Sequence, residues 1–463
     1  MSLVAALIFA VLIVTLCRIT RDRGMKRTVA LWVACGWLFL ASSRNPTGWL
    51  QAQQSKGSAD TAYDSGSAFD RNILTALMLG GVIVLTSRSE RSIAFLKANL
   101  PIVLFFVYCG MSAAWSDHPD ISIKRWFRGL GDLVMVMVIL TDRDWVRAFR
   151  WVYTRLACVL MPLSVLFFRW FPGLGRSYDI HDGHVTVTGV TDDKNLLGAI
   201  CALFSLSVIW CVIDAIQNSR PRKKWFLAGY LFVIANAFYL VYLANSATAT
   251  AVLVQGAIVL ILTSLPKVYR RRARIHWIAG GILGFSALNL FFGSTLLQML
   301  GRNSTLTGRT ELWRLCLTLV RNPLVGEGYE SFWLGDRLER MWQYIPGVNQ
   351  AHNGYLEIYL NLGWVGVILL VAFLIFGYRN ITRAVGRHEP AANLRLALFV
   401  VSCIANCTEA GFKMMHPMWF AMLVVATYRP AMGFVKRRRL AQESEEQTAK
   451  ESEPEFTPIP LPS

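Results

Sequence analysis

The feature that most constrains this chain is a series of apolar blocks separated by short charged segments. Examples are "SLVAALIFAVLIVTLC" from Ser2, "NLPIVLFFVYCGMSAAW" from Asn99 and "WVGVILLVAFLIFGY" from Trp364. Such blocks are near the ~20 residues that a helix needs to cross a bilayer. Because 54% of the 463 residues are hydrophobic and only 16% are charged, a soluble fold would lack the charge to cover its surface. The sequence therefore predicts an all-α polytopic integral membrane protein with about 12–13 transmembrane helices.

The positions of the basic residues predict the topology. A net charge of +18 would also suit a nucleic-acid-binding protein, but most of the 47 Lys and Arg residues lie in clusters between the apolar blocks. The clusters span residues 18–27, 88–97, 143–155, 220–224, 267–274, 379–395 and 429–439. Each follows an odd-numbered block or precedes an even-numbered one, so the positive-inside rule places them in the cytoplasm and the N-terminus outside. We expect membrane lipid, and no nucleic acid, as a partner.

The loops divide the chain into four predicted regions. Residues 1–298 hold transmembrane helices 1–10, with outward loops near 43–70 and 169–194. Residues 299–351 form one large outward loop, and residues 352–432 hold helices 11–13. Residues 433–463 are charged, Pro-rich and poor in apolar side chains, a composition that predicts a disordered cytoplasmic tail.

The large outward loop contains one segment with helical periodicity. In "TELWRLCLTLVRNP", Trp313, Cys316, Leu317 and Val320 are spaced as the apolar face of an amphipathic helix. Pro323 is expected to end this helix. The helix is predicted to lie either on the membrane surface or on top of the helix bundle.

A group of polar residues precedes the eleventh apolar block, in "QAHNGYLEIYLNLGWVGVILL", residues 350–370. His352 and Asn353 stand at its outer end, and Glu357 would support His352 directly only if the first helical turn were irregular. Taken alone, His352 would suit an interfacial histidine among lipid headgroups. The outward loop before it is nevertheless rich in arginine, on the side where positive charge is scarce. These arginines are Arg302, Arg309, Arg314, Arg321, Arg337 and Arg340.

The arginines and the histidine fit one reaction type. Planar guanidinium groups bind phosphate through paired charge-assisted hydrogen bonds. A sugar carried on a lipid diphosphate needs its departing diphosphate stabilised, and the attacking hydroxyl needs a base that titrates near neutral pH, as histidine does. Diphosphate is already a good leaving group, so we expect neither a metal nor another cofactor. The segment "YDIHDGH", residues 178–184, carries a turn-forming Asp-Gly and is interpreted as a solvated loop rather than a metal site.

The segment "STLTGRTELWRLCLTLVRNPLVGEGYESFW" followed by "HNGYLEIYLNLGWVGVILL" resembles the signature region of the O-antigen ligase and polysaccharide polymerase superfamily. In that family a Gly-Arg-Thr…Trp segment, a Pro-Leu-x-Gly-x-Gly turn and a His-Asn-x-x-Leu…Gly helix frame a large periplasmic loop. "AAWSDHPDISIKRWFRGLGD", "TDDKNLLGAI" and "ANSATATAVL" are similar to the exopolysaccharide-polymerase branch. The resemblance implies a GT-C-like, multi-pass protein of the bacterial inner membrane with its active site facing the periplasm.

The resemblance also implies roles for individual residues. His352 matches the family's base, and Arg309 matches an arginine that contacts the diphosphate. Family ligases have a second arginine near the outer start of a middle span, where this chain has Ser246, Ala247 and Thr248. The candidates for the missing charge, with Arg128 preferred, are Arg128, Arg125 and Arg176.

Arg125 and Arg128 are three residues apart and share one face of a helix, although interfacial anchoring would also explain the pair. Substrate binding is further assigned to Arg302, Arg314, Asn353 and Lys194.

Three functions compete on the sequence alone. A polymerase would join oligosaccharide repeats carried on undecaprenyl diphosphate to an acceptor glycan, with a chain-length regulator as a further candidate partner. A ligase would move the finished glycan to a lipid A-core. A transporter without chemistry is disfavoured because few ionisable residues fall at mid-membrane depth. Glu409 and Lys413 are the main exceptions and would equally suit the lining of a donor cavity.

Overall fold

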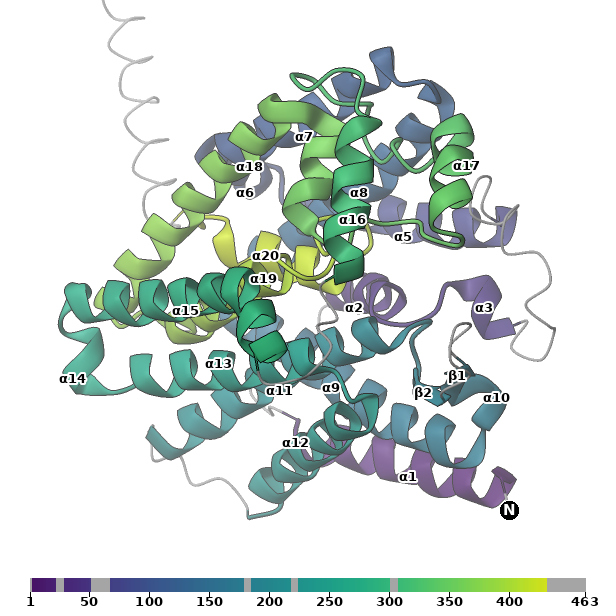
Figure 1. Ribbon diagram of the computed structural model, residues 1–463. Helices are drawn as coiled ribbons and strands as arrows, with labels where there is room; N and C mark the ends of the chain where they lie inside the picture. The colour runs from purple at the N-terminus through teal and green to yellow at the C-terminus, as the bar shows by residue number, and fades with distance from the viewer. Residues whose placement is uncertain are drawn as a thin grey trace, which may run out of the picture.

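The computed structural model describes residues 2–21, 29–50, 67–178, 185–217, 224–299 and 307–430. Almost all of the elements in this part of the chain are helices (Figure 1). In chain order they are α1 (Ser2–Ile19), α2 (Ala30–Ala41), α3 (Pro46–Leu50), α5 (Ala68–Thr86), α6 (Ser89–Ala98), α7 (Leu100–Met111), the 3₁₀ helix η1 (Ser112–Trp115), α8 (Pro119–Leu140), α9 (Trp145–Trp170), α10 (Pro172–Gly175), β1 (Arg176–Tyr178), β2 (Val185–Val187), α11 (Lys194–Gln217), α12 (Lys224–Ala244), α13 (Ala247–Thr263), α14 (Pro266–Tyr269), α15 (Arg272–Met299), α16 (Thr307–Thr318), α17 (Gly335–Tyr344), α18 (Gly354–Gly386), α19 (Ala392–Ala405) and α20 (Pro417–Ala426). The two strands pair antiparallel, with Ser177 opposite Thr186.

Within the described residues, six helices are long and apolar enough to cross a membrane: α1, α5, α9, α11, α12 and α18. A seventh span is made if α6 and the α7–η1 segment, which meet at 89°, count together. Four shorter apolar helices, α2, α13, α19 and α20, pack among them. The protein is thus an all-α polytopic membrane protein, as predicted, while the crossing number of about 12–13 stays a prediction.

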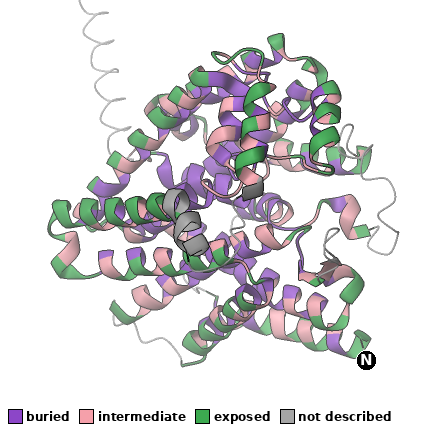
Figure 2. Cartoon of the chain, in the orientation of Figure 1, coloured by how far each residue is buried: buried purple, intermediate pink, exposed green. Residues whose placement is uncertain are grey.

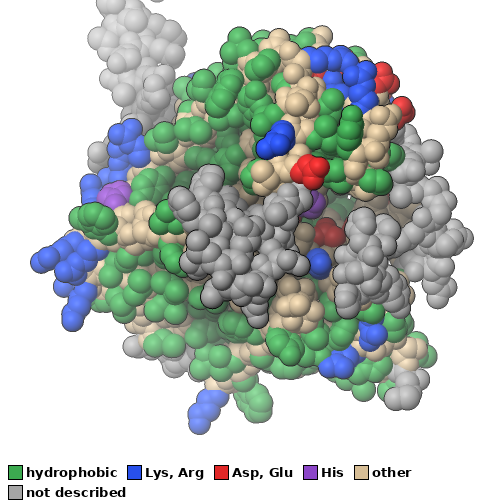
Figure 3. Space-filling view, viewed as in Figure 1, with side chains coloured by type: hydrophobic (Ala, Val, Ile, Leu, Met, Phe, Trp, Pro, Cys, Tyr) green, Lys and Arg blue, Asp and Glu red, His purple; other side chains and the backbone are tan. Residues whose placement is uncertain are grey.

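The bundle is organised around α11, which contacts α9, α12, α13, α19 and α20. Helix α11 is apolar on all sides, so its buried residues run from Leu197 to Cys211 without a polar stripe. Buried residues fill the interior, while α1 and α15 turn exposed apolar side chains outward (Figure 2). Hydrophobic side chains are spread widely over the described part of the face seen in Figure 3. This distribution suits a bundle whose outer surface meets lipid.

Helix α18 is two helices joined at a kink. Gly363 has φ +61° and ψ −164°, values that an L-side chain rarely adopts. The backbone amides of Trp364 and Val365 donate to the carbonyls of Pro323 and Leu324, 3.0 and 3.1 Å away. The polar first part, residues 354–362, therefore packs against residues 307–351, which are called the outward loop after the side predicted for them. Only the second part, residues 364–386, continues as an apolar span.

The outward loop has a small hydrophobic core of its own. Helices α16 and α17 pack on the first part of α18 through Leu312, Cys316, Phe332, Trp333, Met341, Ala351 and Leu360. The predicted amphipathic helix corresponds to α16, which packs on the first part of α18 and ends at Thr318, before the Pro323 that was expected to end it. Its predicted face is wrong in part: Leu317 is 50% exposed, and Val320 follows the end of α16 at Thr318. Leu312 takes the inward position instead, and α17 was not predicted.

Helix α8 and the residues just before it form hydrogen bonds with this loop. Asp117, just before α8, accepts from Arg337 at 2.7 Å, and Ser122 donates to the carbonyl of Tyr329 at 2.9 Å. Farther along the same helix, Asp132 accepts from the amide of Met415 at 2.9 Å. The "AAWSDHPDISIKRWFRGLGD" segment therefore holds both the outward loop and residues 406–416, the two segments that build the site described next. The predicted tail, residues 433–463, lies outside the described residues.

Candidate active site

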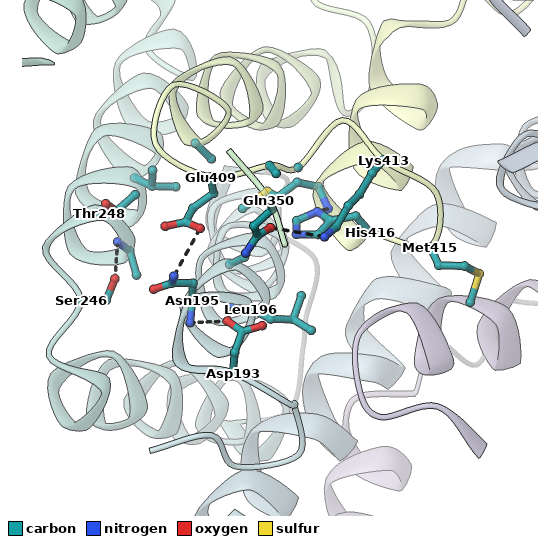
Figure 4. Close-up of a pocket in the computed structure, with 17 residues that line it drawn as sticks. Asp193, Asn195, Leu196, Ser246, Thr248, Gln350, Glu409, Lys413, Met415 and His416 are labelled. Carbon is teal, nitrogen blue, oxygen red and sulfur yellow. Dashed lines mark hydrogen bonds between the residues drawn. The ribbon is translucent and has the colours of Figure 1, made fainter. Parts of the chain in front are cut away.

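A polar cavity lies where the starts of α11 and α13 meet the loop formed by residues 406–416 (Figure 4). It encloses about 840 Å³, counting the space at its open mouth. Its polar lining comes from Asp193, Asn195, Ser246, Thr248, Gln350, Glu409, Lys413 and His416. The N-terminal ends of two helices give this side of the cavity a positive potential.

Glu409 is the centre of the polar contacts at this cavity. Its Oε2 lies 3.4 Å from Nδ1 of His352 and accepts from Nδ2 of Asn195 at 3.3 Å. Its Oε1 lies 3.6 Å from a guanidinium nitrogen of Arg309. One carboxylate therefore connects the residue predicted as base with the residue predicted to contact diphosphate.

The backbone on both sides of His352 is fixed by hydrogen bonds. His352 itself has φ +50° and precedes α18, whose N-cap residue Asn353 accepts from the amides of Tyr355 and Leu356. On the other side, Glu357 accepts from the amide of Ala351 at 2.5 Å. These contacts leave the His352 side chain 30% exposed beside Glu409. Glu357 therefore supports His352 through the backbone rather than through the imidazole ring.

Arg309 reaches the same place from the first turn of α16. It donates to the carbonyl of Thr408 at 2.8 Å and lies against Glu409, with 26% of its side chain exposed. A guanidinium has five N–H donors, so one that is partly exposed and contacts the protein through two nitrogens keeps donors available for an anion. The structure therefore brings Arg309 and His352 to the same carboxylate, while their roles as diphosphate contact and base stay predictions.

Two further groups of residues 406–416 line the cavity. Lys413 donates to Oε1 of Gln350 at 3.4 Å. His416 caps α20 by accepting from the amide of Met418, and burial, with a smaller effect of Lys413, lowers the pKa of His416 to about 3. His416 is therefore uncharged at neutral pH and a poor proton acceptor, which favours His352 as the base.

The other arginines predicted to supply positive charge lie outside this lining. Arg125 donates to the carbonyl of Glu330. Arg128, half-buried on the next turn of α8, interacts electrostatically with Asp70. Arg176 donates to the carbonyl of Phe168 at 3.1 Å. The structure thus brings none of the three to the cavity beside Glu409.

The remaining predicted binding residues are dispersed. Arg314 is exposed on α16, and Lys194 is half-buried at the start of α11 without lining the cavity. Asn353 is spent on capping α18. Arg302 lies outside the described residues. These assignments remain predictions.

The structure explains two of the quoted motifs. In "TDDKNLLGAI", Asp193 caps α11 by accepting from two amides at 2.8 Å, which places Asn195 against Glu409. In "ANSATATAVL", Ser246 caps α13, and Thr248 in the first turn of this helix lines the cavity. Sequence reasoning missed Asn195, because its partner is 214 residues away.

Among the residues that the structure describes, no group of three or more His, Cys, Asp or Glu side chains is close enough to hold an ion. Residues 179–184, which carry most of the Asp and His residues of "YDIHDGH", lie outside the described residues.

Part of the chain is similar to known proteins. Residues 231–371, from α12 to the second part of α18, match the family model described as O-Antigen ligase. Over 291 residues the chain is 25% identical to the Exopolysaccharide production protein ExoQ of Rhizobium meliloti (strain 1021). That alignment covers 60% of this chain and 64% of the relative.

The apolar helices define a multi-pass membrane protein, and the cavity lies beside the starts of two of these helices, α11 and α13. The matched region contains both Arg309 and His352, and it carries the signature motifs from the Gly-Arg-Thr segment to the His-Asn helix. Over this region the chain is similar to the O-antigen ligase family, and it spans less than two thirds of the curated relative that it matches.

Proposed function

We propose that this protein is an inner-membrane glycosyltransferase that polymerises oligosaccharide repeat units carried on undecaprenyl diphosphate. The observation that carries the proposal is the Glu409 carboxylate, which connects His352 with Arg309 at the edge of a polar cavity. One carboxylate thus holds both a base and a phosphate-binding cation. This arrangement suits a reaction in which an acceptor hydroxyl displaces a lipid diphosphate in a single step. The reaction needs no metal in this proposal.

In the proposed reaction the hydroxyl of the acceptor glycan attacks the anomeric carbon of the donor sugar. With Nδ1–H of His352 donating to Glu409, Nε2 carries the lone pair that takes the hydroxyl proton. The bond between the anomeric carbon and the diphosphate oxygen breaks, and the bonding electrons leave with the lipid diphosphate. Arg309 offsets the charge that develops on this leaving group. A single displacement inverts the configuration at the anomeric carbon.

The location of the site is part of the proposal. The site lies beside the starts of α11, α13 and α18, the ends that the positive-inside rule places outside the cytoplasm. In a bacterial inner membrane this side is the periplasm. The donor would enter from the bilayer, with its lipid among the apolar helices and its diphosphate at the cavity.

Polymerase and ligase share this donor and this base, and they differ in the acceptor. The name of the relative concerns exopolysaccharide production, whereas the family model is described as a ligase. Where family ligases carry their second arginine, this chain has Ser246 and Thr248 in the cavity wall. This departure and the relative favour the polymerase, and transfer to a lipid A-core is the second candidate.

The test is a deletion strain complemented with the wild-type gene, His352→Ala or Arg309→Ala, with surface and secreted glycans resolved by size. For a polymerase, both variants lose long polymer while single repeats remain on the lipid carrier. Long chains that persist on the carrier without reaching lipid A would identify a ligase. Unchanged glycans, with the variant proteins present at wild-type levels, would refute an enzymatic role for this site.

A further inference from the structure

Besides Arg309, which contacts Glu409 of the cavity wall without lining the cavity itself, the site has a second positive charge. Lys413 lies in residues 406–416 and lines the cavity together with Ser246 and Thr248, the residues that stand where a second arginine would be expected. Figure 4 shows Lys413 on the side of the cavity opposite to Ser246 and Thr248, with its ammonium directed toward Gln350. The cavity therefore keeps a second cation, presented from a different wall.

The ammonium of Lys413 is only partly used by the protein. Within the described residues its one hydrogen bond is the 3.4 Å contact with the neutral amide of Gln350. An ammonium has three N–H donors. The other two donors of Lys413 have no hydrogen-bond acceptor among the described residues and are available to a ligand. Lys413 is half-buried, and a partly dehydrated cation beside an open polar cavity favours an anionic ligand.

The carboxylates in the cavity wall do not cancel this charge. Asp193 is spent on capping α11, where it accepts from the amides of Asn195 and Leu196 at 2.8 Å. Glu409 is paired with Arg309 at 3.6 Å and lies beside His352. Among the described residues that line the cavity, Lys413 is the one Lys or Arg, and it has no paired carboxylate within the cavity.

We infer that Lys413 is the second cation on the departing diphosphate, taking the place of the arginine that this chain lacks at Ser246–Thr248. Arg309 would bind the diphosphate from the α16 side and Lys413 from the side of residues 406–416. The inference rests on the proposed function, because it assigns a residue to the same leaving group. It also explains why Ser246 and Thr248 are tolerated in the opposite wall.

Lys413 also has a structural alternative. The carboxyl groups of Glu330 and Glu357 interact electrostatically with it, so Lys413 could serve only to neutralise these two buried acids. The two roles predict different results when the positive charge is moved to another position in the cavity. A positive charge moved to the opposite wall would still meet a diphosphate in the cavity, but it would not lie beside Glu330 and Glu357.

The experiment measures binding of farnesyl diphosphate, a short polyprenyl diphosphate, to the purified full chain in detergent by isothermal titration calorimetry. Lys413→Ala is expected to weaken binding at least about tenfold, the loss typical of one charged hydrogen bond. Lys413→Arg should bind like wild type. Lys413→Ala combined with Thr248→Arg should recover most of the lost affinity, because Thr248 lines the same cavity.

Two outcomes would overturn the inference while leaving the proposed function intact. One is unchanged binding by Lys413→Ala when Arg309→Ala binds weakly. The other is rescue of Lys413→Ala by arginine at position 413 but not at position 248, which would assign Lys413 to the buried acids. If neither Arg309→Ala nor Lys413→Ala changes binding, the diphosphate site of the proposed function is itself wrong. Should Lys413→Ala fail to fold, Lys413→Gln removes the charge, keeps a donor for Gln350 and gives the same readout.

Discussion

The carboxylate of Glu409 lies 3.4 Å from Nδ1 of His352. A carboxylate at this nitrogen selects the tautomer that leaves Nε2 free, and it stabilises the imidazolium that forms when Nε2 takes a proton. The same carboxylate lies against Arg309, so it also sets the direction of the guanidinium. Glu409 is therefore a positioning residue. Its contact with His352 bears on kcat, and its contact with Arg309 bears on the KM for the lipid-linked donor.

Glu409→Gln is predicted to lower kcat without raising the KM for the lipid-linked donor. Glutamine keeps the size of the side chain but removes the charge that supports the imidazolium. The loss of one charged hydrogen bond corresponds to about a 10–100-fold lower rate. Removing the carboxylate also frees Arg309 from its ion pair, so the affinity for diphosphate is not expected to fall. Steady-state transfer assays with purified protein would measure both constants, and a raised KM at unchanged kcat would contradict this role.

His352→Ala is predicted to slow sugar transfer by about 10²–10⁴-fold, the contribution of a positioned general base. Binding of farnesyl diphosphate should be retained, because the base does not contact the leaving group. Added imidazole is expected to restore part of the rate, since it supplies the missing proton acceptor. His276→Ala is the matched control: His276 is exposed on α15 and its ring contacts Tyr378. Equal loss of activity in both variants would point to a general effect on folding.

The family resemblance assigned Arg309 and His352 to one site because both lie in one signature region on the two flanks of the outward loop. It could not predict which other charges join them. Glu409 lies 57 residues beyond His352, and Asn195 comes from another helix 214 residues before Glu409. Such contacts depend on how α11 and α19 pack, and both helices are too uniformly apolar for their orientation to be read from a pattern.

The arginine-rich loop shows the same limit more sharply. Arg337 was grouped with the others as evidence for an anionic ligand, but it is 4% exposed and is paired with Glu327 and Asp117. Composition counts charges on one side of the membrane and cannot distinguish a structural ion pair from a binding group. Here the partner Asp117 is 220 residues away in sequence.

Arg337→Ala is predicted to destabilise the outward loop by about 3–5 kcal/mol, because it leaves the buried carboxylate of Glu327 without its partner. Glu327 and Arg337 are 6% and 4% exposed and are 2.6 Å apart. Thermal unfolding and limited proteolysis of the purified protein would measure the change. Arg340→Ala, on the exposed face of the same helix, should stay within about 0.5 kcal/mol of wild type. A similar small effect for both variants would show that the buried pair adds little to loop stability.

Gly363→Ala is predicted to destabilise the protein by about 1–3 kcal/mol for its positive φ alone. Gly363 has φ +61°, and a Cβ there would lie 2.3 Å from the carbonyl oxygen of Leu324. The clash falls on backbone, so relief requires the 323–328 turn to move away from α18. Because that turn leads into the loop that covers His352, transfer activity should fall together with stability.

Gly281→Ala makes the same chemical change in α15, where a Cβ meets nothing within 4 Å. This control should be neutral or stabilising by roughly 0.5–1 kcal/mol, the gain of alanine over glycine inside a helix. The melting temperature and the transfer rate of both variants, measured in the same detergent, test whether the cost is specific to position 363. Wild-type stability in Gly363→Ala would mean that the kink between the two parts of α18 does not need glycine. The polar first turn would then have to be kept out of the lipid by the loop contacts alone.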